Sequence, residues 1–141
     1  MPAPTPYLHL PGTAREALEL YQRVFGGELV LATYEDFSRT DGPAHAIAHG
    51  ELRGAVDVCA SDATEQDEVF ASRGLMMALL GRAEPTTLRT WFAALSEGGE
   101  VVDPLQRRPW GASDGQVRDR FDVLWLIGYE HAEADPAQRA G

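Results

Sequence analysis

Two histidines four residues apart, His45 and His49, are the first residues in this sequence whose spacing suggests chemistry. On a helix this spacing would place both imidazoles on one face, within reach of a single zinc ion. We interpret the segment 44–52 as a strand, on which the two side chains share a face but stand about 13 Å apart, at roughly 3.3 Å per residue. The sequence therefore does not predict a zinc ion bound by this pair. His49 alone is a candidate for binding a polar ligand through a neutral imidazole, and an inert histidine bonded to the backbone is the alternative.

One further pattern resembles a catalytic motif, and one further residue, Cys59, is a possible nucleophile. The run Gly111-Ala112-Ser113-Asp114-Gly115 matches G-x-S-x-G, which exposes a nucleophilic serine only where a strand enters and a helix leaves. Here a strand-like segment follows, so we interpret the run as a loop between strands. Cys59 lies in an apolar segment, and burial raises the pKa of a thiol, which argues against a catalytic cysteine.

The remaining candidates would contact a ligand through polar, aromatic or thioether groups. His9 alternates with Leu8 and Leu10 and so lies opposite the face that these leucines bury. Asp62, at a strand end, could contact a ligand or cap a backbone turn. Two tryptophans and a methionine could line a cavity for a flat apolar ligand or belong to the core. The candidate ligand-binding residues are His9, His49, Asp62, Met76, Trp110 and Trp125, with no assigned metal ligand and an unknown catalytic residue.

The elements that must position these residues come in the order strand, helix, strand, and that order occurs twice. The first helix is expected to begin at the capping box Thr13–Glu16, in which the threonine hydroxyl accepts a backbone N–H. The second is expected to begin at Pro85. Gly26-Gly27-Glu28 recurs as Gly98-Gly99-Glu100 at an offset of 72 residues, and strand, helix and strand surround it both times. This repetition predicts an internal duplication.

Each half continues with two more strand-like segments, 44–52 and 55–60 in the first and 116–121 and 123–128 in the second. We therefore predict an α+β fold of two tandem βαβββ modules in one compact domain. The expected boundaries are 6–60 for the first module, 61–73 for a linker, 74–130 for the second module and 131–141 for a loose C-terminal tail.

Composition excludes several classes of function. The 141 residues include 12 basic side chains, all arginine, and 22 acidic ones, a formal net charge of −10. Such a chain lacks the basic face that nucleic acid requires, and no apolar run approaches the roughly 18 residues of a membrane span. Without lysine there is no Schiff-base catalyst. The single cysteine permits no internal disulfide, which fits a cytoplasmic location.

Several motifs together resemble a known family. They include Pro6-Tyr7-Leu8, Phe25-Gly26-Gly27-Glu28, Ser61-Asp62 and Asp119-Arg120-Phe121, and the likeness covers about residues 6–129. With these motifs the sequence resembles the vicinal oxygen chelate superfamily of glyoxalase I, bleomycin-resistance proteins and extradiol dioxygenases. Within it, the sequence is similar to the branch labelled demethylubiquinone methyltransferase-like. The resemblance implies two curved mixed sheets, each with a cavity on its concave face, and a homodimer.

The resemblance also implies where a metal would be held. In the metal-dependent members, one His or Glu from the first and fourth strands of each module holds a divalent ion that chelates two neighbouring substrate oxygens. Alignment places these positions near Pro6, around Ser61-Asp62, at Leu75 and at Leu126, and of these only Asp62 could bind a metal. One carboxylate does not hold a divalent ion against water.

The expected function is therefore that of a small-molecule-binding protein without metal or other cofactor, whose partners are a small-molecule ligand and a second copy of the chain. The alternative is a metal-dependent enzyme of lyase, isomerase or dioxygenase type acting on a substrate with vicinal oxygens. Its metal would be held in an unfamiliar way, through His9, His49 or Asp62.

Overall fold

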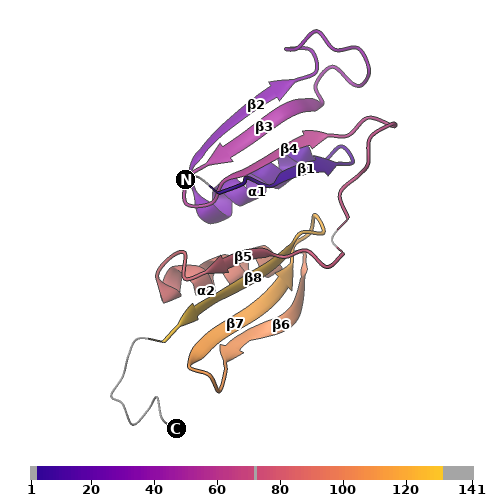
Figure 1. The fold of residues 1–141 in the computed structure, drawn as a ribbon. Helices are drawn as coiled ribbons and strands as arrows, with labels where there is room; N and C mark the ends of the chain where they lie inside the picture. Colours follow the sequence, from indigo (N-terminus) through magenta and orange to yellow (C-terminus); the bar gives the residue numbers. More distant parts are fainter. Residues whose placement is uncertain (1–2, 72, 132–141) are drawn as a thin grey trace. The chain divides into compact units, whose positions relative to one another are not determined.

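The computed structural model describes residues 3–71 and 73–131. The chain forms two compact units, one that ends at Phe70 and one that begins at Ala71. Each unit has one helix and one four-stranded sheet within the described residues (Figure 1). The predicted α+β fold of two tandem βαβββ modules is confirmed.

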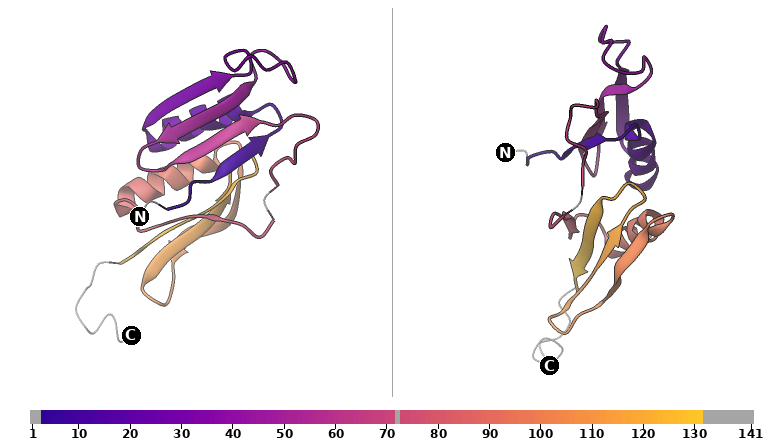
Figure 2. Two further views of the ribbon diagram at one scale, coloured as in Figure 1. Left: turned by 45° about the horizontal axis from the view of Figure 1, so that its top comes forward. Right: turned by 90° about the vertical axis from the view of Figure 1, so that its right-hand side faces the viewer.

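The first unit contains, in chain order, β1 (Tyr7–Leu10), α1 (Ala14–Phe25), β2 (Glu28–Thr33), β3 (Ile47–Arg53) and β4 (Val58–Asp62). The sheet order is β1-β4-β3-β2, with β1 parallel to β4 and the other pairs antiparallel. Helix α1 packs on one side of this sheet, as the edge-on view in Figure 2 shows.

Side-chain alternation divides the first sheet into two faces. In β1, Leu8 and Leu10 are buried, whereas Tyr7 and His9 are exposed. In β3, Gly50 lies against Leu18 of α1, so a side chain there would overlap the helix. Residues one position away from Gly50 therefore point to the other side. We call the side of this sheet opposite α1 the distal face.

The start of α1 differs from the prediction. Thr13 makes no side-chain cap hydrogen bond, so the predicted capping box is wrong. Instead, the first N–H of the helix, that of Ala14, donates a hydrogen bond to Oδ1 of Asp62 at 2.9 Å. A carboxylate at a helix N-terminus is a stronger acceptor than a hydroxyl, because it is ionised and meets the positive end of the helix dipole.

The second unit contains β5 (Met77–Leu80), α2 (Pro85–Ser96), β6 (Glu100–Arg107), β7 (Ala112–Arg118) and β8 (Leu124–Glu130). Its sheet order, β5-β8-β7-β6, repeats that of the first unit, with β5 parallel to β8. Proline occupies the first turn of α2, as predicted. The core between α2 and the sheet is built from fully buried aliphatic side chains, among them Leu88, Leu95, Val117 and Ile127.

Several element boundaries differ from the sequence-based ones. Strand β4 includes Ser61 and Asp62, which the sequence suggested as the start of a linker. Strand β3 begins only at Ile47, so His45 lies in a turn before it. The predicted tail 131–141 lies, apart from His131, outside the described residues. Among the residues that are described, no helix has the length and apolar character needed to cross a membrane.

Candidate functional site

The distal face of the first sheet brings together polar and aromatic side chains from three strands. Tyr7 of β1 is the register partner of Cys59 in β4, which is in turn the partner of Glu51 in β3. Register partners point to the same side of a sheet, and side chains two residues apart in a strand do so as well. Tyr7, His9, His49, Glu51 and Cys59 therefore share the distal face.

Tyr7 contacts both His9 and His49, the two histidines among the candidate ligand-binding residues. Its hydroxyl is 2.9 Å from Nδ1 of His49, and the two rings are stacked with centroids 5.5 Å apart. The ring of His9 meets Tyr7 edge to face at 5.7 Å. Tyr7 is 46% exposed and the His49 side chain 40%, so a ligand can reach both. The structure thus joins His9 and His49 through a tyrosine.

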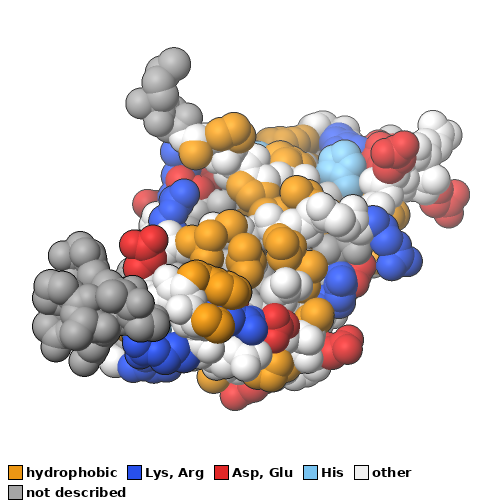
Figure 3. Space-filling model, turned by 60° about the horizontal axis from the view of Figure 1, so that its bottom comes forward, with side chains coloured by type: hydrophobic (Ala, Val, Ile, Leu, Met, Phe, Trp, Pro, Cys, Tyr) orange, Lys and Arg blue, Asp and Glu red, His pale blue; other side chains and the backbone are white. Residues whose placement is uncertain are grey.

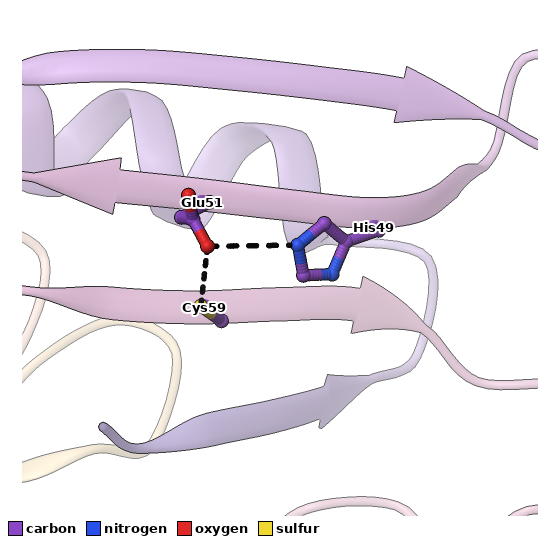
Figure 4. A group of neighbouring side chains, drawn as sticks. All are labelled: His49, Glu51 and Cys59. Carbon is purple, nitrogen blue, oxygen red and sulfur yellow. Dashed lines mark hydrogen bonds and ion pairs between the residues drawn. The ribbon is translucent and has the colours of Figure 1, made fainter. Parts of the chain in front are cut away.

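Glu51 connects His49 to Cys59. One of its oxygens, Oε1, is 3.8 Å from Nε2 of His49 and 3.8 Å from the Cys59 thiol, as Figure 4 shows. The other oxygen, Oε2, accepts a hydrogen bond from Nε of Arg53 at 2.6 Å.

The two acidic groups of this cluster have their pKa values shifted in opposite directions. The hydrogen bond from Arg53 lowers the pKa of the Glu51 carboxyl. Burial, and then the neighbouring Glu51 carboxylate, raises the pKa of the Cys59 thiol. At neutral pH the cluster therefore presents a carboxylate beside a neutral thiol, as expected for a cysteine that is not a nucleophile.

Asp62 has a structural role in the first unit. Its Oδ1 accepts the Ala14 N–H at 2.9 Å and its Oδ2 accepts the Ile47 N–H at 2.8 Å, so it joins the starts of α1 and β3. The residue is 8% exposed, and its backbone oxygen accepts the Tyr34 hydroxyl at 2.6 Å. Of the two roles that the sequence left open for Asp62, these contacts support the capping of backbone groups.

The three candidates in the second unit lie at different places. Met76 precedes β5 and is 40% exposed, and Trp110 is 70% exposed in the turn between β6 and β7. Trp125 is 2% exposed in β8, and its indole N–H is donated to Oδ2 of Asp119 at 2.8 Å. Trp125 therefore belongs to the core of this unit.

The positions at which the superfamily resemblance would place metal ligands do not fit a chelated ion. The side chains of Pro6, Leu75 and Leu126 offer no donor atom. Both carboxylate oxygens of Asp62 already accept backbone N–H groups. No step of a metal-dependent reaction can therefore be assigned to these four positions.

The G-x-S-x-G run forms part of a β-hairpin. Ser113 lies within β7, which β8 and not a helix follows, so the run does not form a nucleophile elbow. The Ser113 hydroxyl is 2.9 Å from Nε2 of His131, but the other ring nitrogen, Nδ1, is 3.4 Å from the Arg107 guanidinium. A catalytic histidine is oriented by a carboxylate at that position, which the Arg107 guanidinium does not supply.

The sequence-based candidates for ligand binding did not include three members of the distal-face cluster, Tyr7, Glu51 and Cys59. The signal for Glu51 was its spacing of two from His49, which puts both on one side of a strand. The turn at Arg53-Gly54 then makes β3 and β4 antiparallel neighbours. The register that pairs Glu51 with Cys59 is set by the whole hairpin and does not follow from any short motif.

Comparison with known proteins identifies the family. The model of the Glyoxalase/Bleomycin resistance protein/Dioxygenase superfamily matches residues 10–127, so the chain belongs to this superfamily. Among individual proteins, Protein YjdN of Escherichia coli (strain K12) is 28% identical over 137 residues, which cover 87% of this chain and 92% of YjdN.

Two solved structures show how closely the fold is shared. Protein PA1353 from Pseudomonas aeruginosa is 30% identical, with a TM-score of 0.77 and coverage of 94% of this chain and 100% of that one. The putative 3-demethylubiquinone-9 3-methyltransferase, PhnB protein, from Bacillus cereus has a TM-score of 0.74 at 20% identity, over 93% and 100% of the two chains. The second likeness shows the fold alone.

Proposed function

We propose that this superfamily member is a small-molecule-binding protein whose ligand lies on the distal face of the first sheet. The observation that carries the proposal is the connected group of Tyr7, His49 and Glu51, which is partly exposed and held in place by its own hydrogen bonds. Binding by this group requires no metal ion.

The chemistry of the group indicates the kind of ligand. Stacked tyrosine and histidine rings offer a flat apolar surface, and the rims of the rings carry a hydroxyl and ring nitrogens that donate or accept hydrogen bonds. Glu51 supplies a carboxylate that accepts hydrogen bonds. A flat, partly apolar molecule with hydroxyl or amine donors at one edge would satisfy all three.

A metal-dependent lyase, isomerase or dioxygenase acting on vicinal oxygens is the second candidate. One observation favours it: His49, Glu51 and Cys59 have possible ligand atoms within 4.8 Å of one another. The four positions implied by the superfamily resemblance give it no support. A turnover assay on vicinal dicarbonyl and catechol compounds, with and without added divalent metal, would separate this candidate from a binding protein.

The proposal includes a homodimer in the cytoplasm. Large hydrophobic side chains are exposed in the second unit, including Leu75, Met76 and Leu80 at 40–55%, and hydrophobic side chains also reach the surface on the face shown in Figure 3. Burying such side chains is favourable and commonly drives association. Light scattering after size-exclusion chromatography should give twice the chain mass of 15.4 kDa, and a mass of one chain would contradict the dimer.

The binding proposal is tested by a thermal-shift screen against quinones, thiols and aromatic antibiotics. A ligand present at about 100 times its Kd stabilises the protein by roughly 2.7 kcal/mol, a shift of several degrees. The shift should fall in Tyr7→Phe, which removes the hydroxyl next to His49, and in His49→Gln.

His45→Gln is the matched control, because His45 is exposed in the turn before β3 and is not a member of the cluster. A hit whose shift is unchanged in Tyr7→Phe and His49→Gln would place the ligand elsewhere. The absence of any hit from the broad panel would count against the binding function itself.

A further inference from the structure

The distal face holds three potential metal ligands of different chemical type close together. The atoms of His49, Glu51 and Cys59 that could bind an ion all lie within 4.8 Å of one another. Both His49 Nε2 and Cys59 Sγ are 3.8 Å from Glu51 Oε1. In a tetrahedral zinc site with bonds of about 2.0–2.3 Å, ligand atoms stand about 3.3–3.7 Å apart. Small side-chain rotations are enough to reach that spacing, and Figure 4 shows the three side chains directed toward one another.

We propose that His49, Glu51 and Cys59 form a binding site for a zinc-type divalent ion, with one position left open. This inference goes beyond the proposed function, because the ion binds to these three side chains whether or not an organic ligand does.

The groups around the three side chains leave the correct atoms available to an ion. The Tyr7 hydroxyl is paired with Nδ1 of His49, and Nε2 faces Glu51. Histidine ligands in proteins commonly bond through their second nitrogen in this way, which fixes the ring and its tautomer. Arg53 binds Oε2 of Glu51, while Oε1 faces His49 and Cys59. Both hydrogen-bond partners therefore orient a ligand and do not occupy its coordinating atom.

The types of the three donors select the class of ion. Magnesium and calcium require six or more oxygen ligands, which one carboxylate does not supply. The ion displaces the proton of the Cys59 thiol to solvent when it binds. An imidazole, a carboxylate and the resulting thiolate together suit zinc and the chemically similar cobalt(II). Three protein ligands leave the fourth tetrahedral position for water or a ligand oxygen, as in catalytic zinc sites. The His49 and Glu51 side chains are 40% and 27% exposed, so that position is reachable.

The site differs from the chelate that the superfamily resemblance implies. Its ligands come from two adjacent antiparallel strands, β3 and β4, within one unit. None of the three is Pro6, Asp62, Leu75 or Leu126, the positions at which the resemblance places metal ligands.

The test is a titration of the full-length, tag-free protein, first stripped of metal with a chelator, with Co²⁺ and then Zn²⁺ alone. We expect one Co²⁺ per chain, with a thiolate-to-cobalt charge-transfer band that Zn²⁺ displaces, and a Zn²⁺ Kd of micromolar or below. His49→Gln, Glu51→Gln and Cys59→Ser should each weaken Zn²⁺ binding at least 10-fold, and Cys59→Ser should also abolish the charge-transfer band. His45→Gln should bind as the wild type does, since His45 is exposed in the turn before β3.

The outcomes separate this inference from the proposed function. Circular dichroism and thermal unfolding of each metal-free variant establish that it is folded, and Glu51→Gln tests the site with the buried thiol intact. The absence of a stoichiometric cobalt band would overturn the inference, as would an equal loss of affinity in His45→Gln. Metal binding without any hit in the organic panel would sustain the inference and contradict the proposed function, and the opposite pair of results would do the reverse.

Discussion

At the residue scale, Asp62 joins a helix and a strand of the first unit. Its two oxygens accept backbone N–H groups from α1 and β3, which lie far from it in the sequence. A buried N–H group that loses its acceptor lowers the free energy of unfolding by more than an exposed hydrogen bond raises it, because water does not replace the lost partner. Asp62 therefore fixes where the helix and the strand begin relative to β4.

Asp62→Asn is expected to lower the free energy of unfolding by about 2–3 kcal/mol, because the carboxamide NH₂ replaces one acceptor and faces a buried N–H. The control is Asp36→Asn, since Asp36 accepts the Thr33 N–H at 2.8 Å in an exposed turn. That change should cost well under 1 kcal/mol. Urea unfolding of the two variants measures the difference in their free energies of unfolding, provided that both have the same m value, the slope of that free energy against urea concentration. Equal costs would show that the Asp62 contacts do not stabilise the unit.

Tyr34 gives a second prediction, which depends on pH. The residue is 1% exposed, and its hydroxyl donates a hydrogen bond to the backbone oxygen of Asp62 at 2.6 Å. Burial raises the pKa of Tyr34 above its ordinary value of 10.0. Tyr34→Phe should cost about 1 kcal/mol near pH 8, where the tyrosine is protonated in both states.

Above pH 10 the difference between wild type and Tyr34→Phe should shrink. The unfolded tyrosine loses its proton first, while the folded one keeps it, so the unfolded state binds fewer protons and the stability of the wild type falls as pH rises. The phenylalanine variant lacks this term. Urea unfolding of both proteins from pH 8 to 11 measures how the difference in their free energies of unfolding changes with pH. A difference that grows with pH would contradict the raised pKa of Tyr34.

At the element scale, two glycines of the β6–β7 hairpin have different reasons to be glycine. Gly115 lies in β7 where β6 is irregular, and a Cβ there would stand 2.6 Å from backbone atoms of Leu105. Gly111, in the turn, has a φ of +88° with open space around it. The first position demands the absence of a side chain, and the second demands only an unusual backbone conformation.

Gly115→Ala should therefore destabilise the protein by about 2–3 kcal/mol, because backbone atoms of β6 must move. Gly111→Ala should cost about 1 kcal/mol, the strain of a left-handed alanine. Urea midpoints of the two variants provide the comparison. A cost for Gly111→Ala equal to or above that for Gly115→Ala would show that β6 adapts freely.

The strand boundaries show what periodicity predicts well and what it misses. The helices were predictable because both are amphipathic and end near glycine pairs. The alanine-rich segment 44–46 was interpreted as strand, and it does pair with the chain after β2. Ala46 and Ala44 accept backbone N–H groups from Tyr34 and Glu35. An irregularity at Ala32/Thr33 separates this pairing from the regular ladder, and no residue type marks it.

The candidate site was less predictable than the fold, because the site depends on strand register and tertiary packing, which no residue type marks. His9 and His49 stood out by residue type, but what joins them is Tyr7, whose hydroxyl bond to His49 spans 42 positions in the sequence. The role of Asp62 likewise depends on where β4 ends relative to α1. Such relations follow from tertiary packing and register, which a single sequence does not specify.

At the scale of the whole molecule, the Gly-Gly pair that occurs in both halves has a structural cause. Gly26 and Gly98 follow the two helices with φ values of +74° and +73°. A Cβ on the next glycine, Gly27 or Gly99, would overlap the backbone carbonyl of Arg53 or Arg118. Those arginines are the register partners of Glu28 and Glu100. Both halves thus require Gly-Gly at the same place, because a strand end passes directly against it.

The two halves differ where a loop replaces a turn. The helices start 71 residues apart and β2 and β6 start 72 apart, but β3 and β7 start only 65 apart. The connection 34–46 in the first unit is longer than the turn 108–111 in the second. The side chains on the strands differ as well. The distal face of the first sheet carries the cluster around Tyr7, whereas Met76, just before β5, and Leu80, at the end of β5, are exposed hydrophobic side chains. Within the described residues, the two halves therefore share an architecture but differ in the side chains that these strands expose.

Net charge provides the last prediction. A formal charge of −10 from 22 acidic and 12 basic side chains makes the folded chain repel itself more than the expanded one, and salt screens this repulsion. The described ion pairs are mostly exposed, so screening them costs little. Raising NaCl from about 10 mM to 300 mM at pH 7 should increase the melting temperature by about 2–4 °C, which corresponds to roughly 1 kcal/mol for a chain of this length.

The matched control for this prediction is the same salt series near the sequence pI of 4.7, where net charge is close to zero and the increase should disappear. Differential scanning calorimetry at the two pH values measures both series. A melting temperature at pH 7 that falls with added NaCl would mean that local ion pairs outweigh overall repulsion. In that case the arginine–carboxylate contacts, such as those of Arg108 with Asp103 and Asp114, would stabilise the fold more than exposed pairs usually do.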